Sequence, residues 1–215
     1  MFFSKDSVIL DINMTYNQLY KTKNVWGDKP NDLLFKVYNK IEAGSKFLDL
    51  GCGQGRDSLF MLREGFQVTA VDSSLKGLEI IKNEVTASEL SQDRISLFCE
   101  DIVDFTIKEN DYSIINIFNA LQFLLKTDAI ELIHKSKKAL RDKGYIIIAG
   151  FMVDDPSYLK MSDKKCCFFE QQELKKIFSD FQIVFYEEKK VLDKGHQGSP
   201  EPHIHSVVKK SKIMF

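Results

Sequence analysis

The sequence predicts an α/β fold: a mostly parallel sheet of seven strands, with helices on both faces, that finishes in an antiparallel hairpin. Short apolar runs alternate with segments of helical periodicity through the first two thirds of the chain. Several of these runs are apolar without alternation, as in parallel strands covered on both faces. The last two runs have no helical segment between them, so they cannot be joined by a parallel crossover.

The first half of the predicted sheet is built from two strand–helix pairs. Residues 46–50 form an apolar run that ends in glycines, which is typical of a buried strand. Residues 56–64 carry apolar side chains at helical spacing, and Gly65 closes that helix. The pattern repeats with a strand over 67–72 and a helix over 74–90.

The middle of the chain continues the alternation. Residues 94–99 and 112–117 are predicted strands, and 129–140 form a predicted helix that Gly144 stops. The apolar run 145–150 is the next strand. The same strand–helix order therefore persists to residue 150.

The last third changes the order. Residues 170–179 are predicted helical, and 182–190 and 204–212 read as strands. The connection 191–203 shows no helical pattern, which predicts an antiparallel hairpin with a long loop.

The chain of 215 residues has the length of one domain. We expect an N-terminal helical lid over 1–44, including a helix over 31–41, a core over 45–151, and a C-terminal helix and hairpin over 152–215.

Composition excludes several classes of function. Thirty basic residues against 31 acidic ones give a net charge of −1, without the broad basic surface that binds nucleic acid. The longest apolar stretch, 114–125, is interrupted by amides and is shorter than the roughly 18 residues that a membrane span needs. No leader is visible over residues 1–10, and the four cysteines form no CxxC pair. We therefore expect a cytoplasmic protein, monomeric or homodimeric, that binds neither membrane nor nucleic acid.

The chemistry is concentrated in a glycine-rich turn. Gly51, Gly53 and Gly55 lie between the first strand and the first helix, where the missing Cβ atoms permit a sharp turn close to a ligand. Asp72 ends the next strand and Asp101 follows the third. Carboxyl ends of parallel strands are where open α/β sheets bind ligands, and a carboxylate there accepts from ribose hydroxyls.

Two cofactors suit such a turn. A dinucleotide requires G-x-G-x-x-G, whereas the third glycine here comes one residue early and Arg56 takes its place. Asp49 precedes the first glycine by two residues, and its charge would repel a pyrophosphate but attract an amino or sulfonium group. The pattern favours S-adenosylmethionine.

The sequence resembles class I S-adenosylmethionine-dependent methyltransferases. Residues 48–55 (LDLGCGQG) resemble their first motif, 71–74 (VDSS) the second and 100–102 (EDI) the third. The resemblance covers nearly the whole chain and implies a Rossmann-like sheet of seven strands whose last strand is reversed.

A narrower similarity is to the tellurite-resistance methyltransferase group. It rests on residues 53–58 (GQGRDS), 65–72 (GFQVTAVD), Tyr20, and 26–30 (WGDKP) with Trp26.

The resemblance implies a role for each matching residue in cofactor binding. Gly51 and Gly53 would let the backbone lie close to the methionine and ribose portions of S-adenosylmethionine. Asp49 would face the amino group of the cofactor. The ribose would be held by Asp72 beside Ser73, the adenine by Asp101 and the Ile102 N–H, and the methyl-donor pocket by Asn116 and Phe118. Tyr20, Trp26, Cys52 and Arg56 complete the expected cofactor set.

Each of these residues has a structural alternative. Asp72 and Asp101 could cap the segments that follow them. Asn116 could be a buried amide and Phe118 a core residue, and Trp26 could pack rather than cover a ligand. Arg56 is unfavourable for the dipole at a helix N-terminus, so we expect an anionic partner, either a nearby carboxylate or the substrate.

Methyl transfer needs alignment and a dry site, and it needs a base only when the nucleophile arrives protonated. Three of the four histidines, His196, His203 and His205, lie in the predicted hairpin loop 192–205. We favour catalytic or substrate-orienting histidines over a three-histidine metal site, and we expect no metal. The alternative is that these histidines are exposed polar residues of the hairpin. The tellurite-resistance group carries a histidine and arginines in this hairpin; His196 matches the histidine, but the arginines are not reproduced.

The sequence therefore predicts transfer of a methyl group from S-adenosylmethionine to a small molecule, such as a tellurite- or selenite-like oxyanion or a thiol. The alternatives are an NAD(P)-dependent oxidoreductase and a non-catalytic cofactor-binding protein.

Overall fold

The computed structural model describes residues 16–153, 166–192 and 200–210. The chain folds as two compact units, residues 1–105 and 106–215. Each unit carries part of the predicted strand pattern. None of the helices in the described ranges is long and apolar enough to cross a membrane.

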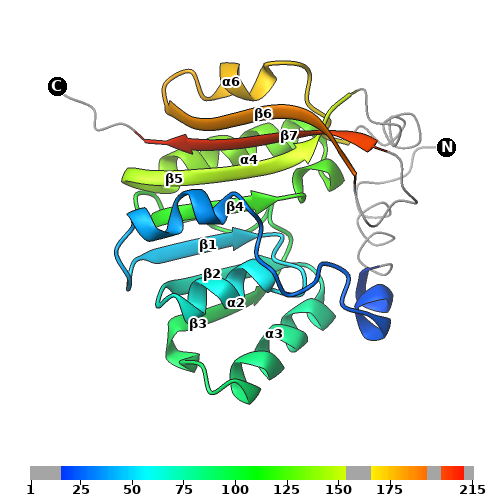
Figure 1. The fold of residues 1–215 in the computed structure, drawn as a ribbon, viewed down its shortest axis with the longest axis vertical. Coiled ribbons are helices and arrows are strands. Elements are labelled where there is room, and N and C mark those ends of the chain that lie inside the picture. Colours follow the sequence, from blue (N-terminus) through cyan, green and yellow to red (C-terminus); the bar gives the residue numbers. More distant parts are fainter. Residues whose placement is uncertain (1–15, 154–165, 193–199, 211–215) are drawn as a thin grey trace. The chain divides into compact units, whose positions relative to one another are not determined.

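The first unit contains three parallel strands in the order β3-β2-β1 (Figure 1). Their bounds are Lys46–Leu50 for β1, Gln67–Asp72 for β2 and Ile95–Cys99 for β3. The crossovers are α2 (Arg56–Arg63), and α3 (Leu75–Ala87) followed by the short helix η3 (Gln92–Arg94). These elements confirm the predicted ones to within a few residues at their ends.

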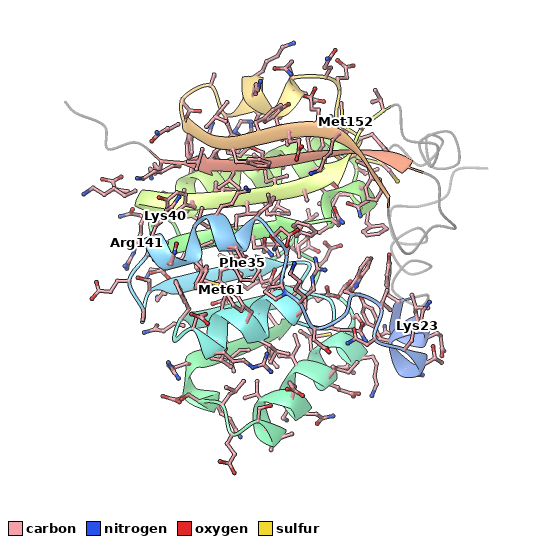
Figure 2. The ribbon with its side chains drawn as sticks, in the orientation of Figure 1. Lys23, Phe35, Lys40, Met61, Arg141 and Met152 are labelled. Atoms are coloured by element: carbon pink, nitrogen blue, oxygen red, sulfur yellow. The ribbon has the colours of Figure 1, made fainter. Side chains whose placement is uncertain are left out.

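The core of the first unit lies between its strands and helices. Phe47, Leu48 and Leu50 of β1 are completely buried, as are Met61 of α2 and Ile81 of α3. Figure 2 labels Met61 in the interior. These are the apolar positions that predicted the strand and the two helices, so periodicity and burial agree here.

The N-terminal segment differs from its prediction. Residues 16–22 are helical, but the helix expected over 31–41 is wrong. Two short 3-10 helices occupy that region, η1 (Leu34–Lys36) and η2 (Tyr38–Lys40). Val37 between them has φ −135°, outside the helical range, so the chain cannot continue as one helix.

The second unit contains four strands in the order β4-β5-β7-β6 (Figure 1). Their bounds are Tyr112–Phe118 for β4, Leu140–Phe151 for β5, Gln182–Leu192 for β6 and Pro200–Lys209 for β7. The helices are η4 (Leu121–Phe123), α4 (Lys126–Ala139) and α6 (Glu173–Ile177). β4 and β5 are parallel, whereas β7 is antiparallel to both β5 and β6, which confirms the predicted reversal.

The sequence predicts that Gly144 stops the helix before β5, and this prediction is wrong. The helix ends at Ala139 and β5 begins at Leu140, so Gly144 lies inside the strand. A Cβ at Gly144 would come 2.8 Å from the Ser113 carbonyl oxygen of β4. The glycine is therefore needed for close approach of two backbones rather than for helix termination.

The hairpin strands are longer than predicted. β6 runs to Leu192 and β7 begins at Pro200, which leaves only 193–199 between them. His203 and His205 consequently lie in β7 and not in a loop, paired with Phe151 and Ala149 of β5. His196 lies outside the described residues.

Candidate functional site

The glycine turn after β1 is held against β2 by backbone hydrogen bonds. The N–H groups of Gly51 and Cys52 both donate to the Val71 carbonyl, at 2.9 and 3.1 Å. Gly53 has φ +55°, and a Cβ there would lie 2.9 Å from the Tyr20 hydroxyl. The turn therefore requires glycine at position 53, for its conformation as well as for space.

Asp72 is the central carboxylate of this turn. Its Oδ2 accepts from the Gly53 N–H and its Oδ1 from the Ser74 N–H, both at 2.8 Å. Burial raises the pKa of Asp72, and these two hydrogen bonds offset part of that rise. The N-cap of α3 is Ser74 and not Asp72, and each oxygen of the Asp72 carboxylate has a further lone pair for a ligand hydroxyl.

Asp49 lies deeper than Asp72. It is only 2% exposed, and its Oδ2 accepts from the Ser58 hydroxyl of α2 at 2.6 Å. Burial, and then the negative charges of Asp72 and Asp49, raise the pKa of the Cys52 thiol. Cys52 is therefore a protonated, buried thiol and not a nucleophile.

Asp101 follows β3, whose last residue, Cys99, pairs with Asp72. The Asp101 Oδ1 accepts from the Val103 N–H at 3.0 Å, and the Asp101 carbonyl accepts from two N–H groups of the next turn. Ile102 is buried. Since Asp72 and Asp101 end neighbouring parallel strands, the first unit brings together the predicted ribose and adenine carboxylates, with Ser73 beside Asp72.

Residues 20–26 cover the glycine turn. The Trp26 Nε1–H donates to the Tyr20 hydroxyl at 3.2 Å, and burial raises the pKa of Tyr20 well above its usual range. The tyrosine is thus a protonated donor beside Gly53. Gln54 fixes the segment, because its Nε2 donates to the Lys23 carbonyl and its Oε1 accepts from the Val25 N–H. Figure 2 shows Lys23 at the periphery, beside the N-terminal helical segment.

Arg56 has the nearby carboxylate that its position called for. Its Nε lies 3.5 Å from Asp57 Oδ1, and its Nη1 donates to the Trp26 carbonyl. Asp57 is buried and also accepts from both the backbone and the amide N–H of Asn31, each at 2.8 Å. The first turn of α2 therefore carries an ion pair, whose carboxylate also holds Asn31 of the N-terminal segment.

A cavity of about 560 Å³ lies between residues 20–28 and helices α2 and α3. Arg56, Arg63 and Glu84 are among its lining residues, whereas Asp49, Asp72 and Asp101 are not. Arg56 thus contributes to the wall of this cavity as well as to the anchor of the N-terminal segment.

The remaining predicted residues belong to the second unit. Asn116 of β4 is 1% exposed and Phe118 is half-buried at the carboxyl end of that strand. The backbones of His203 and His205 run beside the carboxyl end of β5. The ligand roles of all these residues, as of those in the first unit, stay predictions.

Sequence reasoning missed several residues that build the turn. Gln54 and the Asn31–Asp57 pair anchor the N-terminal segment, and Gly77 lies in the first turn of α3, against the glycine turn. A Cβ at Gly77 would lie 2.3 Å from the Gly53 carbonyl oxygen. The sequence signal for this close contact is a glycine in the first turn of a predicted helix, because glycine is unfavourable in helices unless close packing requires it.

Comparison with known proteins decides the family. The family model described as "Tellurite resistance protein TehB" matches residues 15–198. The chain belongs to the TehB family. A curated TehB relative, "Probable S-adenosyl-L-methionine-dependent methyltransferase TehB" of Haemophilus influenzae, is 30% identical over 175 residues, which are 80% of this chain and 56% of the relative. The chain thus spans a little over half the length of the curated TehB proteins that it matches.

Solved structures agree with this family. The crystal structure of TehB from Haemophilus influenzae superposes with a TM-score of 0.72 at 25% identity, covering 91% of this chain and 66% of that one. A Burkholderia thailandensis 1,6-didemethyltoxoflavin-N1-methyltransferase, solved with S-adenosylhomocysteine, gives 0.70 at 15% identity over 99% and 92%. The fold is that of class I methyltransferases, as the sequence predicted.

Proposed function

We propose that this TehB-family chain transfers a methyl group from S-adenosylmethionine to a small-molecule acceptor. The observation that carries the proposal is Asp72, fixed between the N–H groups of Gly53 and Ser74 at the carboxyl end of β2. A carboxylate held in this way, with lone pairs remaining, suits the adjacent hydroxyls of a ribose.

The first unit fits the rest of the cofactor. The absence of a side chain at Gly53 leaves room for the Tyr20 hydroxyl, which lies where a Cβ would stand. Tyr20 is a protonated donor suited to the methionine carboxylate, and Asp101 and the Ile102 N–H suit the adenine edge. The negative charge of Asp49 favours a cationic donor over a pyrophosphate.

The chemistry would be an in-line displacement. S-adenosylmethionine supplies an electrophilic methyl carbon bound to a sulfonium. As the acceptor takes this methyl group, the C–S bond breaks and the neutral thioether S-adenosylhomocysteine is the leaving group. The chain's own part is to align the nucleophile, exclude water and take a proton when the acceptor arrives protonated. We assign acceptor orientation or proton transfer to His196, His203 and His205, and the pocket wall to Asn116 and Phe118. The acceptor would be an oxyanion such as tellurite or selenite, a thiol, or a similar nucleophile.

Calorimetry with S-adenosylhomocysteine and with NAD tests the cofactor. We expect micromolar-range binding of the first and none of the second. Binding of NAD alone would establish the oxidoreductase alternative instead. Release of S-adenosylhomocysteine across oxyanions and thiols then tests catalysis, and a protein that binds the cofactor but never consumes it would be non-catalytic.

The histidines are tested separately. His196→Ala and His203→Ala should lower turnover and leave S-adenosylhomocysteine affinity unchanged. The matched control is His134→Ala, because His134 is exposed on α4. Full turnover in both hairpin variants would leave the hairpin without a catalytic role.

A further inference from the structure

The cavity between residues 20–28 and helices α2 and α3 is not explained by the proposed methyl transfer. Its volume of about 560 Å³ is that of a small-molecule site, and all of its lining residues belong to the first unit. Leu59 of α2 and Ile80 of α3 give it an apolar wall. A ligand in this cavity would be separate from the three cofactor carboxylates, none of which lines it.

Positive charge predominates on the wall of the cavity. Four basic and two acidic residues line it: Lys21, Lys23, Arg56 and Arg63, with Asp28 and Glu84. An excess of basic groups around a concave surface raises the local concentration of anions.

The acidic side chains of the wall already have partners. Glu84 Oε1 lies 2.9 Å from Arg63 Nη2, and Asp28 Oδ1 accepts from the Asn24 amide at 2.8 Å. A cationic ligand would have to compete with these partners and would be repelled by the basic groups, so the wall disfavours it.

The basic side chains keep donors for a ligand. Lys21 and Lys23 are exposed and form no ion pair with any residue in the described ranges. Arg63 meets Glu84 through Nη2, and a guanidinium has further N–H groups on its other nitrogens. Two ammonium groups and part of a guanidinium can therefore donate into the cavity.

The uncharged polar groups of the wall are occupied in holding the N-terminal segment. Gln54 Nε2 donates to the Lys23 carbonyl, and its Oε1 accepts from the Val25 N–H. Asn24 Oδ1 accepts from the Gly27 N–H at 2.9 Å. Recognition of a ligand is thus left to the positive charges.

We propose that this cavity binds a small organic anion, a carboxylate or a phosphate monoester, through Lys21, Lys23 and Arg63. The inference goes beyond the proposed function, because it requires neither the cofactor nor a methyl acceptor.

The bound anion also holds the N-terminal segment in place. Residues 20–28 form one side of the cavity and α2 and α3 form the other, so a ligand that contacts both joins them. Tyr20 belongs to this segment and lies over Gly53. The anion therefore stabilises the cover of the glycine turn.

Two pairs of compounds test the charge requirement. Succinate and succinamide have the same number of heavy atoms, but only succinate is charged. Glycerol 3-phosphate and glycerol compare a phosphate monoester with its uncharged alcohol. In calorimetry at constant ionic strength, we expect at least one of the two anions to bind about tenfold more tightly than its neutral counterpart, the value of two exposed ion pairs. The pair that shows the preference identifies the anion as a carboxylate or a phosphate monoester.

Amide hydrogen exchange tests the effect on the segment. The Val25 N–H, which donates to Gln54, reports on local opening of residues 20–28. An anion that binds only the closed segment should slow this exchange about tenfold at ten times its Kd. The control is the Ala129 N–H of α4 in the second unit, whose exchange should not change.

Three variants place the site. The double variant Lys21→Gln, Lys23→Gln should reduce the preference for the anion to about twofold or less and abolish the slowing of exchange, while the backbone hydrogen bonds of the segment remain. Glu84→Gln should act in the opposite direction and strengthen anion binding about two- to threefold, because it removes a repelling charge and releases Arg63. The matched control is Lys40→Gln, since Lys40 is exposed in the same unit but does not line the cavity.

Three results would overturn the proposal. The first is that neither anion binds more tightly than its neutral counterpart. The second is that the lysine double variant binds the anion as the wild-type chain does, or that Lys40→Gln loses binding equally. The third is that exchange of the Val25 N–H is unchanged when the anion is bound, which would leave the segment without a role in the site.

Discussion

Replacing Asp72 with asparagine probes the cofactor site most directly. The substitution keeps the size of the side chain but removes its charge. It also leaves only one oxygen for the two N–H groups, of Gly53 and Ser74, that Asp72 now accepts from at 2.8 Å. A hydrogen bond to a charged group contributes about 1.5–3 kcal/mol. Loss of one such bond to the ribose should weaken S-adenosylhomocysteine binding roughly 10- to 150-fold.

The same substitution should change the stability of the free protein little. Burial raises the pKa of Asp72, so its ionised form opposes folding above that pKa, and the neutral amide relieves this cost. The lost backbone hydrogen bond offsets the gain, and we expect a net change within about 1 kcal/mol.

Calorimetry and thermal unfolding measure the two effects on one sample. The control is Glu79→Gln, which removes an exposed charge paired with Lys76 on α3 and should leave affinity within twofold. Affinity in Asp72→Asn within twofold of wild type would refute the ribose assignment. A large loss of stability in the free protein would show that Asp72 is mainly structural.

Three further predictions concern the same unit. Acidification from pH 7 should weaken S-adenosylhomocysteine binding, with a midpoint above the ordinary aspartate pKa of 3.8 because the pKa of Asp72 is raised; calorimetry across pH should show no such midpoint in Asp72→Asn. Gly77→Ala should cost about 2–3 kcal/mol of unfolding free energy in urea, since its Cβ would lie 2.3 Å from the Gly53 carbonyl, whereas Lys76→Ala should cost under about 0.5. Ser58→Ala should cost about 1–3 kcal/mol in the same assay, because it takes a donor from the buried Asp49; an unchanged midpoint would contradict this.

Local sequence patterns predicted most of the strands and helices. β2 has the predicted bounds. α2 and α3 follow the apolar spacing, because a helix that buries one face repeats its apolar residues every three or four positions along the chain. Predictions were wrong where a residue's partner was distant. Gly144 looked like a helix stop, but it is required by the Ser113 carbonyl of the neighbouring strand.

The candidate site divides in the same way. The positions of the glycine turn and of Asp72 and Asp101 beside strand ends were predictable from the sequence, because the strands themselves are local patterns. The ligand roles of these residues stay predictions. The hairpin histidines were recognised as a group, but the placement of His203 and His205 in β7 depended on how far the strand pairing extends. Pairing length is set by contacts between strands, and the sequence of one strand does not contain it.

By itself, the sequence determined the α/β order, the turn at Gly51–Gly55 and the resemblance to a methyltransferase family. Each is encoded by residues close together along the chain. Only the tertiary structure placed Tyr20 over Gly53 and Gly77 against the Gly53 carbonyl. Steric fit and hydrogen-bond satisfaction belong to groups brought together by folding, so they can be judged only once the partners, or their absence, are known.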